Sequence, residues 1–115
     1  MRFMIIVKAT PDSEAGRMPS ESLMAAMAAY HQELAQAGVL LDANGLQPSA
    51  KGWRIRYADG RRQAVDGPFA EAKEMVGGFF LLDTASEDEA LAIAAECPAA
   101  EWCSVEVRQL APCYV

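Results

Sequence analysis

Apolar side chains at the start of the chain alternate with the two-residue period of a β-strand. Phe3, Ile5 and Val7 share one face of residues 1–9, and the positions between them are also mostly apolar. A strand with two apolar faces is expected to be covered on both sides. The polar segment 10–19 that follows contains proline, aspartate, serine and glycine and is expected to be a loop.

A helical period follows this segment. Apolar residues three and four positions apart predict an amphipathic helix over residues 20–37, with a serine as its N-cap and Gly38 at its end. The single histidine, His31, lies inside the apolar stripe, between Met27 and Leu34. Two interpretations remain open: a core or interface imidazole with one satisfied hydrogen bond, or a neutral imidazole poised for proton transfer.

The rest of the chain returns mainly to strands. An Asp-Gly pair at positions 59 and 60 predicts a tight hairpin turn, because both residues tolerate positive φ. A serine followed three residues later by glutamate predicts the start of a second helix. The expected elements are a strand at 39–49 that breaks at Asn44-Gly45 and resumes briefly, strands at 53–57, 62–65, 77–83 and 104–110, and a helix from Ser86 to Cys97.

This order of elements contains two β-α-β units with a hairpin inserted between them. It is typical of a ferredoxin-like α+β fold, in which an antiparallel sheet carries both helices on one face. We expect a single domain over residues 1–115. Because two helices cannot cover both faces of the sheet, and the first strand is apolar on both, a second copy is expected to stack on the open face as a homodimer.

Charge and cysteine content exclude several classes of function. The net charge of −6 argues against a nucleic-acid partner, which would need clustered lysines and arginines. No apolar run approaches the roughly 20 residues that cross a membrane, so the cytoplasm is the expected location. The three cysteines lack metal-binding spacing and lie far from the histidine. We therefore expect no bound metal and no cofactor.

The segment DGPFAEAKE, residues 66–74, allows two interpretations. In the architectural one, Asp66 hydrogen-bonds nearby backbone N–H groups in a turn, Phe69 fills the core, and Glu71 and Lys73 decorate the surface. In the functional one, Asp66 is a partly desolvated general base in a cleft, and Lys73 or Arg54 holds an anionic substrate. The sequence does not decide between them.

The same segment resembles the signature of the DGPF group of YCII-related proteins. The opening MRFMIIVKAT, the segment AGVLLDANGLQPS and the closing SVEVRQL are similar to that group too, in the same order. The resemblance implies a dimeric ferredoxin-like α+β barrel. It also implies that a histidine and an aspartate could serve lyase- or dehalogenase-like chemistry on small molecules. Two positions depart from the group: Ala72 replaces its usual threonine, and Gln47 replaces a frequent histidine.

Three functions therefore stay open. The first is a homodimer that binds a small molecule in a cleft near the DGPF turn, with Phe69, Glu71, Lys73 and Arg54 as candidate ligand contacts. The second is an enzyme of lyase or isomerase type, which would use His31 with Asp42 or Asp66 for proton transfer. The third is a structural or regulatory dimer that recognises another protein.

Overall fold

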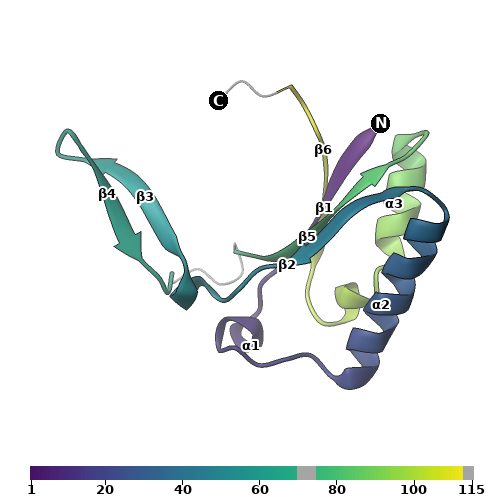
Figure 1. Cartoon of the computed structure of the whole chain (residues 1–115), viewed down its shortest axis with the longest axis horizontal. Helices are drawn as coiled ribbons and strands as arrows, with labels where there is room; N and C mark the ends of the chain where they lie inside the picture. The colour runs from purple at the N-terminus through teal and green to yellow at the C-terminus, as the bar shows by residue number, and fades with distance from the viewer. Residues whose placement is uncertain (70–74, 113–115) are drawn as a thin grey trace.

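The computed structural model describes residues 1–69 and 75–112 (Figure 1). Helices are labelled α, one-turn 3-10 helices η, and strands β. In chain order the elements are β1 (Arg2–Lys8), α1 (Pro11–Glu14), α2 (Glu21–Gln36), β2 (Leu40–Gly45), η1 (Ser49–Lys51), β3 (Trp53–Ala58), β4 (Arg61–Asp66), β5 (Val76–Asp83), α3 (Glu87–Ala95), η3 (Pro98–Glu101) and β6 (Val105–Gln109).

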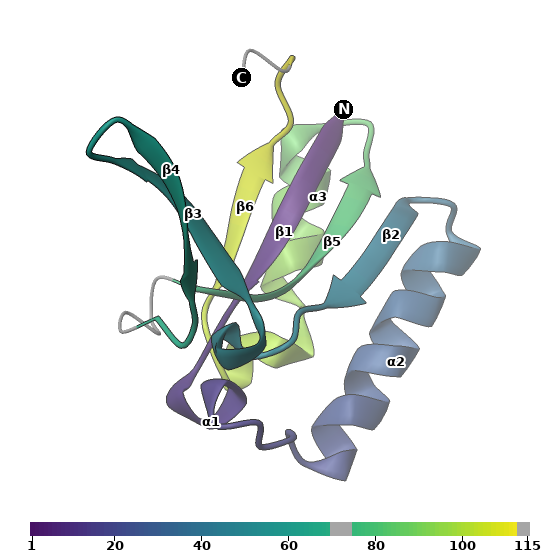
Figure 2. The ribbon, with the colours of Figure 1, turned by 60° about the vertical axis from the view of Figure 1, so that its left-hand side comes forward.

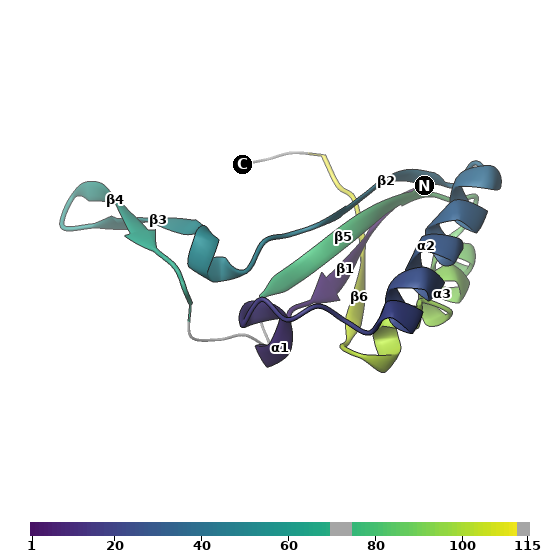
Figure 3. The ribbon, with the colours of Figure 1, turned by 60° about the horizontal axis from the view of Figure 1, so that its bottom comes forward.

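Four strands form the main sheet, in the order β2-β5-β1-β6, and all paired neighbours are antiparallel. Figure 2 shows this sheet nearly face-on, and Figures 1 and 3 show α2 and α3 together on one of its faces. The predicted ferredoxin-like α+β fold is therefore confirmed. No helix within residues 1–69 and 75–112 is long and apolar enough to cross a membrane.

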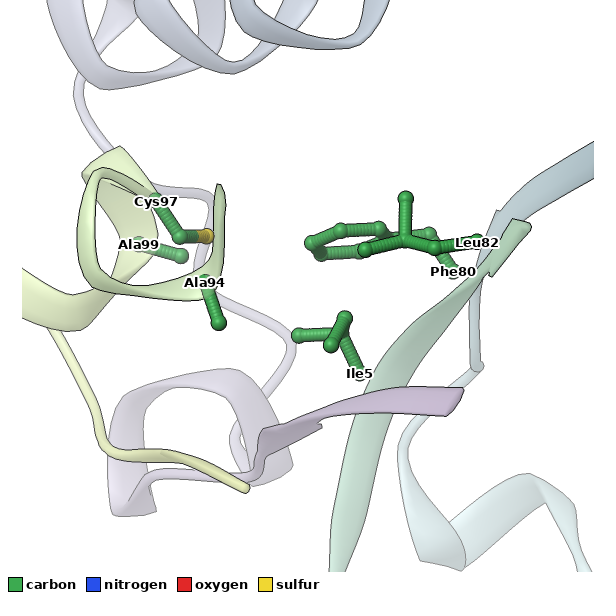
Figure 4. Packing of buried hydrophobic residues seen from close by; sticks show 6 residues of the cluster. All are labelled: Ile5, Phe80, Leu82, Ala94, Cys97 and Ala99. Atoms are coloured by element: carbon green, nitrogen blue, oxygen red, sulfur yellow. The ribbon is translucent and has the colours of Figure 1, made fainter. Parts of the chain in front are cut away.

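The core lies between this sheet and the helices. Ile5, Phe80 and Leu82 are its largest fully buried side chains, and they come from the two central strands (Figure 4). They meet Ala94 of α3 and Cys97 just beyond it. Small residues on the helix side let the backbone approach the sheet, so the large side chains of the strands fill the space between the layers.

Serine side chains cap the N-termini of α2 and α3. The N–H of Leu23 donates to Ser20 Oγ at the start of α2, and the N–H of Glu89 donates to the N-cap hydroxyl of α3. Two predictions are wrong in detail. The strand expected over residues 39–49 ends at Gly45 and does not resume, because η1 begins at Ser49. The segment expected as a loop contains the short helix α1. Thr10 and Ser13 cap its first turn reciprocally, because each side chain accepts the other residue's backbone N–H.

Strands β3 and β4 form a separate two-stranded sheet. Asp59 and Gly60 both have positive φ, 53° and 71°, as the predicted hairpin turn requires. Figures 1 and 3 show this hairpin projecting on the side of the main sheet that faces away from α2 and α3. The hairpin thus makes the molecule longer than a compact domain.

The second face of the main sheet has an apolar centre. Met4 pairs with Leu81 and Ile6 with Phe79, so these four side chains share the face opposite the core. All four are only half-buried, whereas their neighbours on the helix side are buried. We call these four residues the open face. The first strand is apolar on both faces, as predicted, but α2 and α3 cover only one of these faces.

Candidate functional site

A cavity of about 350 Å³ lies between α2 and the main sheet. Helix α2 contributes Leu23, Met24, Met27 and His31 to its wall, because three- and four-residue spacing places them on one side of the helix. Phe80 of β5 closes the sheet side. The lining is mostly apolar, and His31 is its single ionisable side chain among the described residues.

His31 is the chemically distinctive group of this cavity. Its ring packs edge-on against Phe80, with 4.9 Å between ring centroids, and lies 5.7 Å from the ring of Tyr30. Within the described part of the chain its buried Nε2 has no hydrogen-bond partner. Burial lowers the pKa of His31 below its ordinary value of 6.5, because desolvation disfavours the charged imidazolium. The imidazole is therefore neutral near pH 7 and can make one further polar contact.

The two candidate aspartates do not lie beside His31 in the described chain. The carboxylate of Asp42 accepts hydrogen bonds from the N–H of Ala43 and the side-chain amide of Asn44, at 2.9 and 3.1 Å. Asp42 pairs with Leu81, so it lies on the opposite face of the sheet from the cavity. Asp66 is exposed at the end of β4.

The DGPF turn is joined to two distant elements by hydrogen bonds. The N–H of Phe69 donates to Ser49 Oγ at 3.0 Å, and both the N–H and the hydroxyl of Ser49 donate to the carboxylate of Glu14. The guanidinium of Arg54 lies 4.1 Å from the centroid of the Phe69 ring, a cation–π contact. These contacts hold α1, η1, β3 and the turn together.

The other candidate residues of the motif are Asp66, Glu71 and Lys73. The carboxylate of Asp66 makes no hydrogen bond to the rest of the described chain, so the backbone bonds expected of it in an architectural turn are absent there. Ser49 instead supplies the polar contact to the turn. Glu71 and Lys73 lie outside the described residues.

A second cavity, of about 230 Å³, lies beside this turn and is lined by Glu14, Ser49 and Phe69 among others. Its polar groups already satisfy one another, since the Glu14 carboxylate binds Ser49. The unpartnered Nε2 of His31 therefore makes the cavity under α2 the better candidate site. Within the described residues there is no group of three histidine, cysteine, aspartate or glutamate side chains that could hold a metal ion.

Sequence reasoning missed part of this site. Trp102 lines the cavity under α2, although it lies between the second helix and the last strand and carries no periodic signal. Glu14 and Ser49 were not recognised as partners of the turn, because they are 35 residues apart along the chain. Their short polar side chains fit many loops, and only the fold brings them into contact.

The half-buried imidazole of His31 should make stability depend on pH. The native pKa of His31 lies below the unfolded value, so its contribution is fully present above pH 6.5 and is lost as pH falls through the native pKa. We expect the free energy of unfolding of His31→Leu to fall less than that of the parent between about pH 7.5 and about pH 5. Chemical denaturation at both values measures this difference.

Gln32→Leu, on the exposed side of α2, serves as the control and should keep the pH dependence of the parent. Identical pH dependence of the parent and His31→Leu would show that His31 is not desolvated in the native state.

Comparisons with known proteins agree with the fold. The family model of the YCII-related domain matches residues 1–113. An uncharacterized protein of Rhizobium meliloti (strain 1021) is 39% identical over 93 residues, which are 79% of this chain and 75% of the relative. A 5-chloro-2-hydroxyhydroquinone dehydrochlorinase from Burkholderia phenoliruptrix AC1100, solved in complex with 2,5-dihydroxybenzoquinone, superposes with a TM-score of 0.55. That match has 19% identity and covers 96% of this chain and 94% of the enzyme.

Proposed function

The chain belongs to the YCII-related domain family, and from that premise we propose that it binds a small, uncharged, largely apolar molecule in the cavity under α2. The observation that carries this proposal is the buried Nε2 of His31, which lacks a hydrogen-bond partner within the described residues. A buried polar atom without a partner is costly, so a ligand hydroxyl or carbonyl that reaches Nε2 recovers free energy on binding.

The size and lining of the cavity narrow the class of ligand. A volume of about 350 Å³ lies near the lower end of the range for ligand pockets and suits a molecule of one or two rings. The described lining offers no cationic side chain to an anionic ligand, and its apolar groups include Met24, Met27 and Phe80. A neutral imidazole can either accept or donate a hydrogen bond. We infer an aromatic or quinone-like ring that carries hydroxyl or carbonyl oxygens.

The structural neighbour supports this class of ligand. The dehydrochlorinase from Burkholderia was solved with 2,5-dihydroxybenzoquinone, a single ring bearing four oxygen atoms. The single ring of this molecule matches the inferred volume of the cavity, and its oxygen atoms match the polar contact expected at His31 Nε2. This assignment places the ligand under α2, whereas the sequence suggested a cleft near the DGPF turn.

An enzyme of lyase or isomerase type is the second candidate function. The lowered pKa of His31 favours it, because a neutral imidazole can remove a proton from a carbon next to a leaving group or a carbonyl. Within one described chain neither Asp42 nor Asp66 is beside His31 to orient it. The proposal therefore assigns the proton transfer to His31 alone, since Asp42 lies on the opposite face of the sheet and Asp66 is exposed on the hairpin.

Assembly as a homodimer is part of the proposal. The accessible surface of the chain is 7924 Å², whereas about 6,100 Å² is expected of a compact monomer of this mass. Its radius of gyration, 15.8 Å, also exceeds the value of about 13 Å expected of a compact chain of this length. Stacking the open faces of two copies would bury Met4, Ile6, Phe79 and Leu81. The excess surface supports an extensive interface.

A ligand panel tests the proposed binding site. We expect uncharged hydroxylated benzenes and benzoquinones to raise the melting temperature of the parent, and benzoate to leave it unchanged, because benzoate would have to bury a charge. His31→Leu should bind the active compounds about tenfold more weakly, as loss of one hydrogen bond predicts. Calorimetric titration provides the affinities.

Asp66→Ala is the matched control and should bind like the parent, since its carboxylate is exposed outside the cavity lining. Equal affinity of the parent and His31→Leu would exclude His31 as the polar contact. Release of chloride from a chlorinated hydroxyquinol by the parent, lost in His31→Leu, would favour the second candidate over simple binding.

A further inference from the structure

An exposed apolar stripe runs along the β3–β4 hairpin. Alternation along β3 places Trp53, Ile55 and Tyr57 on one face, and their side chains are 70%, 66% and 72% exposed. Their cross-strand partners on that face are Asp66, Ala64 and Arg62. Within residues 1–69 and 75–112, no strand of the main sheet pairs with the hairpin. Three large apolar side chains in a row on a projecting hairpin form a typical interaction surface.

The hairpin cannot depend on its own two strands for stability. An isolated two-stranded hairpin is at best marginally stable in water, and three strands or a packed face are usually needed. Within the described chain its apolar stripe is uncovered. The contacts at its base, such as Arg54 on Phe69, hold the end of the hairpin and leave its length unsupported. The stripe is therefore a candidate contact surface for another molecule.

Charge identifies a second copy of this chain as the covering molecule. Residues 53–66 contain four arginines and two aspartates, a net charge of +2, whereas the whole chain has a net charge of −6. The remainder of the chain therefore carries −8. A positively charged arm and a strongly acidic body are complementary between two copies of one chain.

The direction in which the hairpin projects also supports a second copy of the chain as the molecule that covers the stripe. Figures 1 and 3 show the hairpin on the side of the main sheet that carries the open face. A second copy stacked on that face would therefore occupy the same side of the sheet as the projecting hairpin. In a two-fold dimer each copy would both give and receive an arm.

We propose that the β3–β4 hairpin is a dimerisation arm, whose Trp53, Ile55 and Tyr57 face packs on the body of a second copy. The proposal rests on the homodimer of the proposed function and extends it. The arm adds a second apolar contact to the stacked open faces, and Arg62, which lies on the same face as the stripe, faces the acidic body of the partner.

A pair of charge substitutions on the two faces of the hairpin tests this arm. Ile55→Lys adds one positive charge to the apolar stripe, and Gln63→Lys adds the same charge to the opposite face, since Gln63 pairs with Arg56. We expect Ile55→Lys to weaken dimerisation at least about tenfold, because it buries an unpaired charge, and Gln63→Lys to leave it nearly unchanged. Sedimentation over a dilution series measures both, and far-UV circular dichroism checks the fold.

A third variant separates this proposal from the stacked sheets. Ile6→Lys places a charge on the open face. If Ile6→Lys dissociates the dimer but Ile55→Lys does not, the stacked dimer stands and the arm is excluded. A parent that sediments as a monomer at high micromolar concentration overturns both. Ligand binding by His31 is measured separately, so its failure leaves the sedimentation result intact.

Hydrogen exchange tests the proposed dimerisation arm independently of sedimentation. Backbone amides of residues 53–66 should be protected in the dimeric parent and should exchange faster in Ile55→Lys, because the covering partner is lost. Fast exchange of these amides in a parent that is fully dimeric would show an uncovered hairpin and would overturn the proposal.

Discussion

Gly67→Ala is expected to lower the free energy of unfolding by about 3 kcal/mol, at the upper end of the usual cost of overpacking. A Cβ atom at this position would lie 1.6 Å from the carbonyl oxygen of Ser49 and 2.5 Å from its carbonyl carbon. Both are backbone atoms, so no side chain can rotate away and the turn itself must shift. That shift would also strain the bond from the Phe69 N–H to Ser49 Oγ.

Gly45→Ala is the matched control. A Cβ at Gly45 meets no atom within 4 Å, so its substitution should change the stability by less than about 1 kcal/mol. Urea denaturation of both variants at one protein concentration measures the difference. Faster hydrogen exchange limited to the hairpin would show that the turn detaches locally. Equal stability of the two variants would mean that the close approach at Gly67 does not exist in solution.

Phe80→Ala is expected to cost about 3 to 5 kcal/mol, the usual range for truncating a buried phenylalanine. Phe80 is 1% exposed, and its ring meets Tyr30 edge-on with 5.8 Å between centroids. Truncation would remove this contact and the one to His31, and would enlarge the cavity under α2, which Phe80 lines. The loss of packing therefore falls at the boundary between the core and the candidate site.

Leu91→Ala provides the comparison for this variant. Leu91 lies on α3 and is 46% exposed, so its truncation should cost less than about 1 kcal/mol. Urea denaturation at equal protein concentration compares the two variants, because dimerisation would otherwise shift the apparent stability. A loss below about 1.5 kcal/mol for Phe80→Ala would contradict the tight packing between sheet and helices.

Phe80 and His31 are expected to have opposite effects on stability. The ring of Phe80 fills space in the core and packs against its neighbours, so its truncation should destabilise the protein. His31 leaves a polar atom without a partner in the described chain, so an apolar replacement is expected to be tolerated or stabilising near pH 7. A residue that costs stability where it lies is a better candidate for function than one that contributes to it.

Most of the fold could be predicted from the sequence, because its signals are local. The hairpin turn needed only two residues that accept positive φ, Asp59 and Gly60. Helix α2 needed a serine at its start and a glycine, Gly38, after its end, where φ is +77°. The resemblance to YCII-related proteins is also confirmed. The short helix α1 was missed because four residues cannot show a helical period.

The DGPF segment shows where local reasoning stops. Its residue types predict a turn, and the described chain bends at Gly67. The partners of the turn are Ser49, twenty residues before Phe69, and Glu14, further upstream. No local pattern connects such positions, because their contact depends on how α1, η1 and the hairpin come together in three dimensions.

The sequence by itself determined the alternation of strands and helices, the apolar stripe that contains His31, and the uncovered second face of the sheet. Tertiary structure decided that His31 borders a cavity rather than a closed core, because Phe80 and α2 leave space between them. It also decided the place of Asp42. An irregularity in pairing between Leu40 and Asp42 shifts the register of β2, so that Asp42 pairs with Leu81 on the open side. With regular alternation Asp42 would have shared the helix side with Leu40, since a shift of one residue exchanges the two faces of a strand.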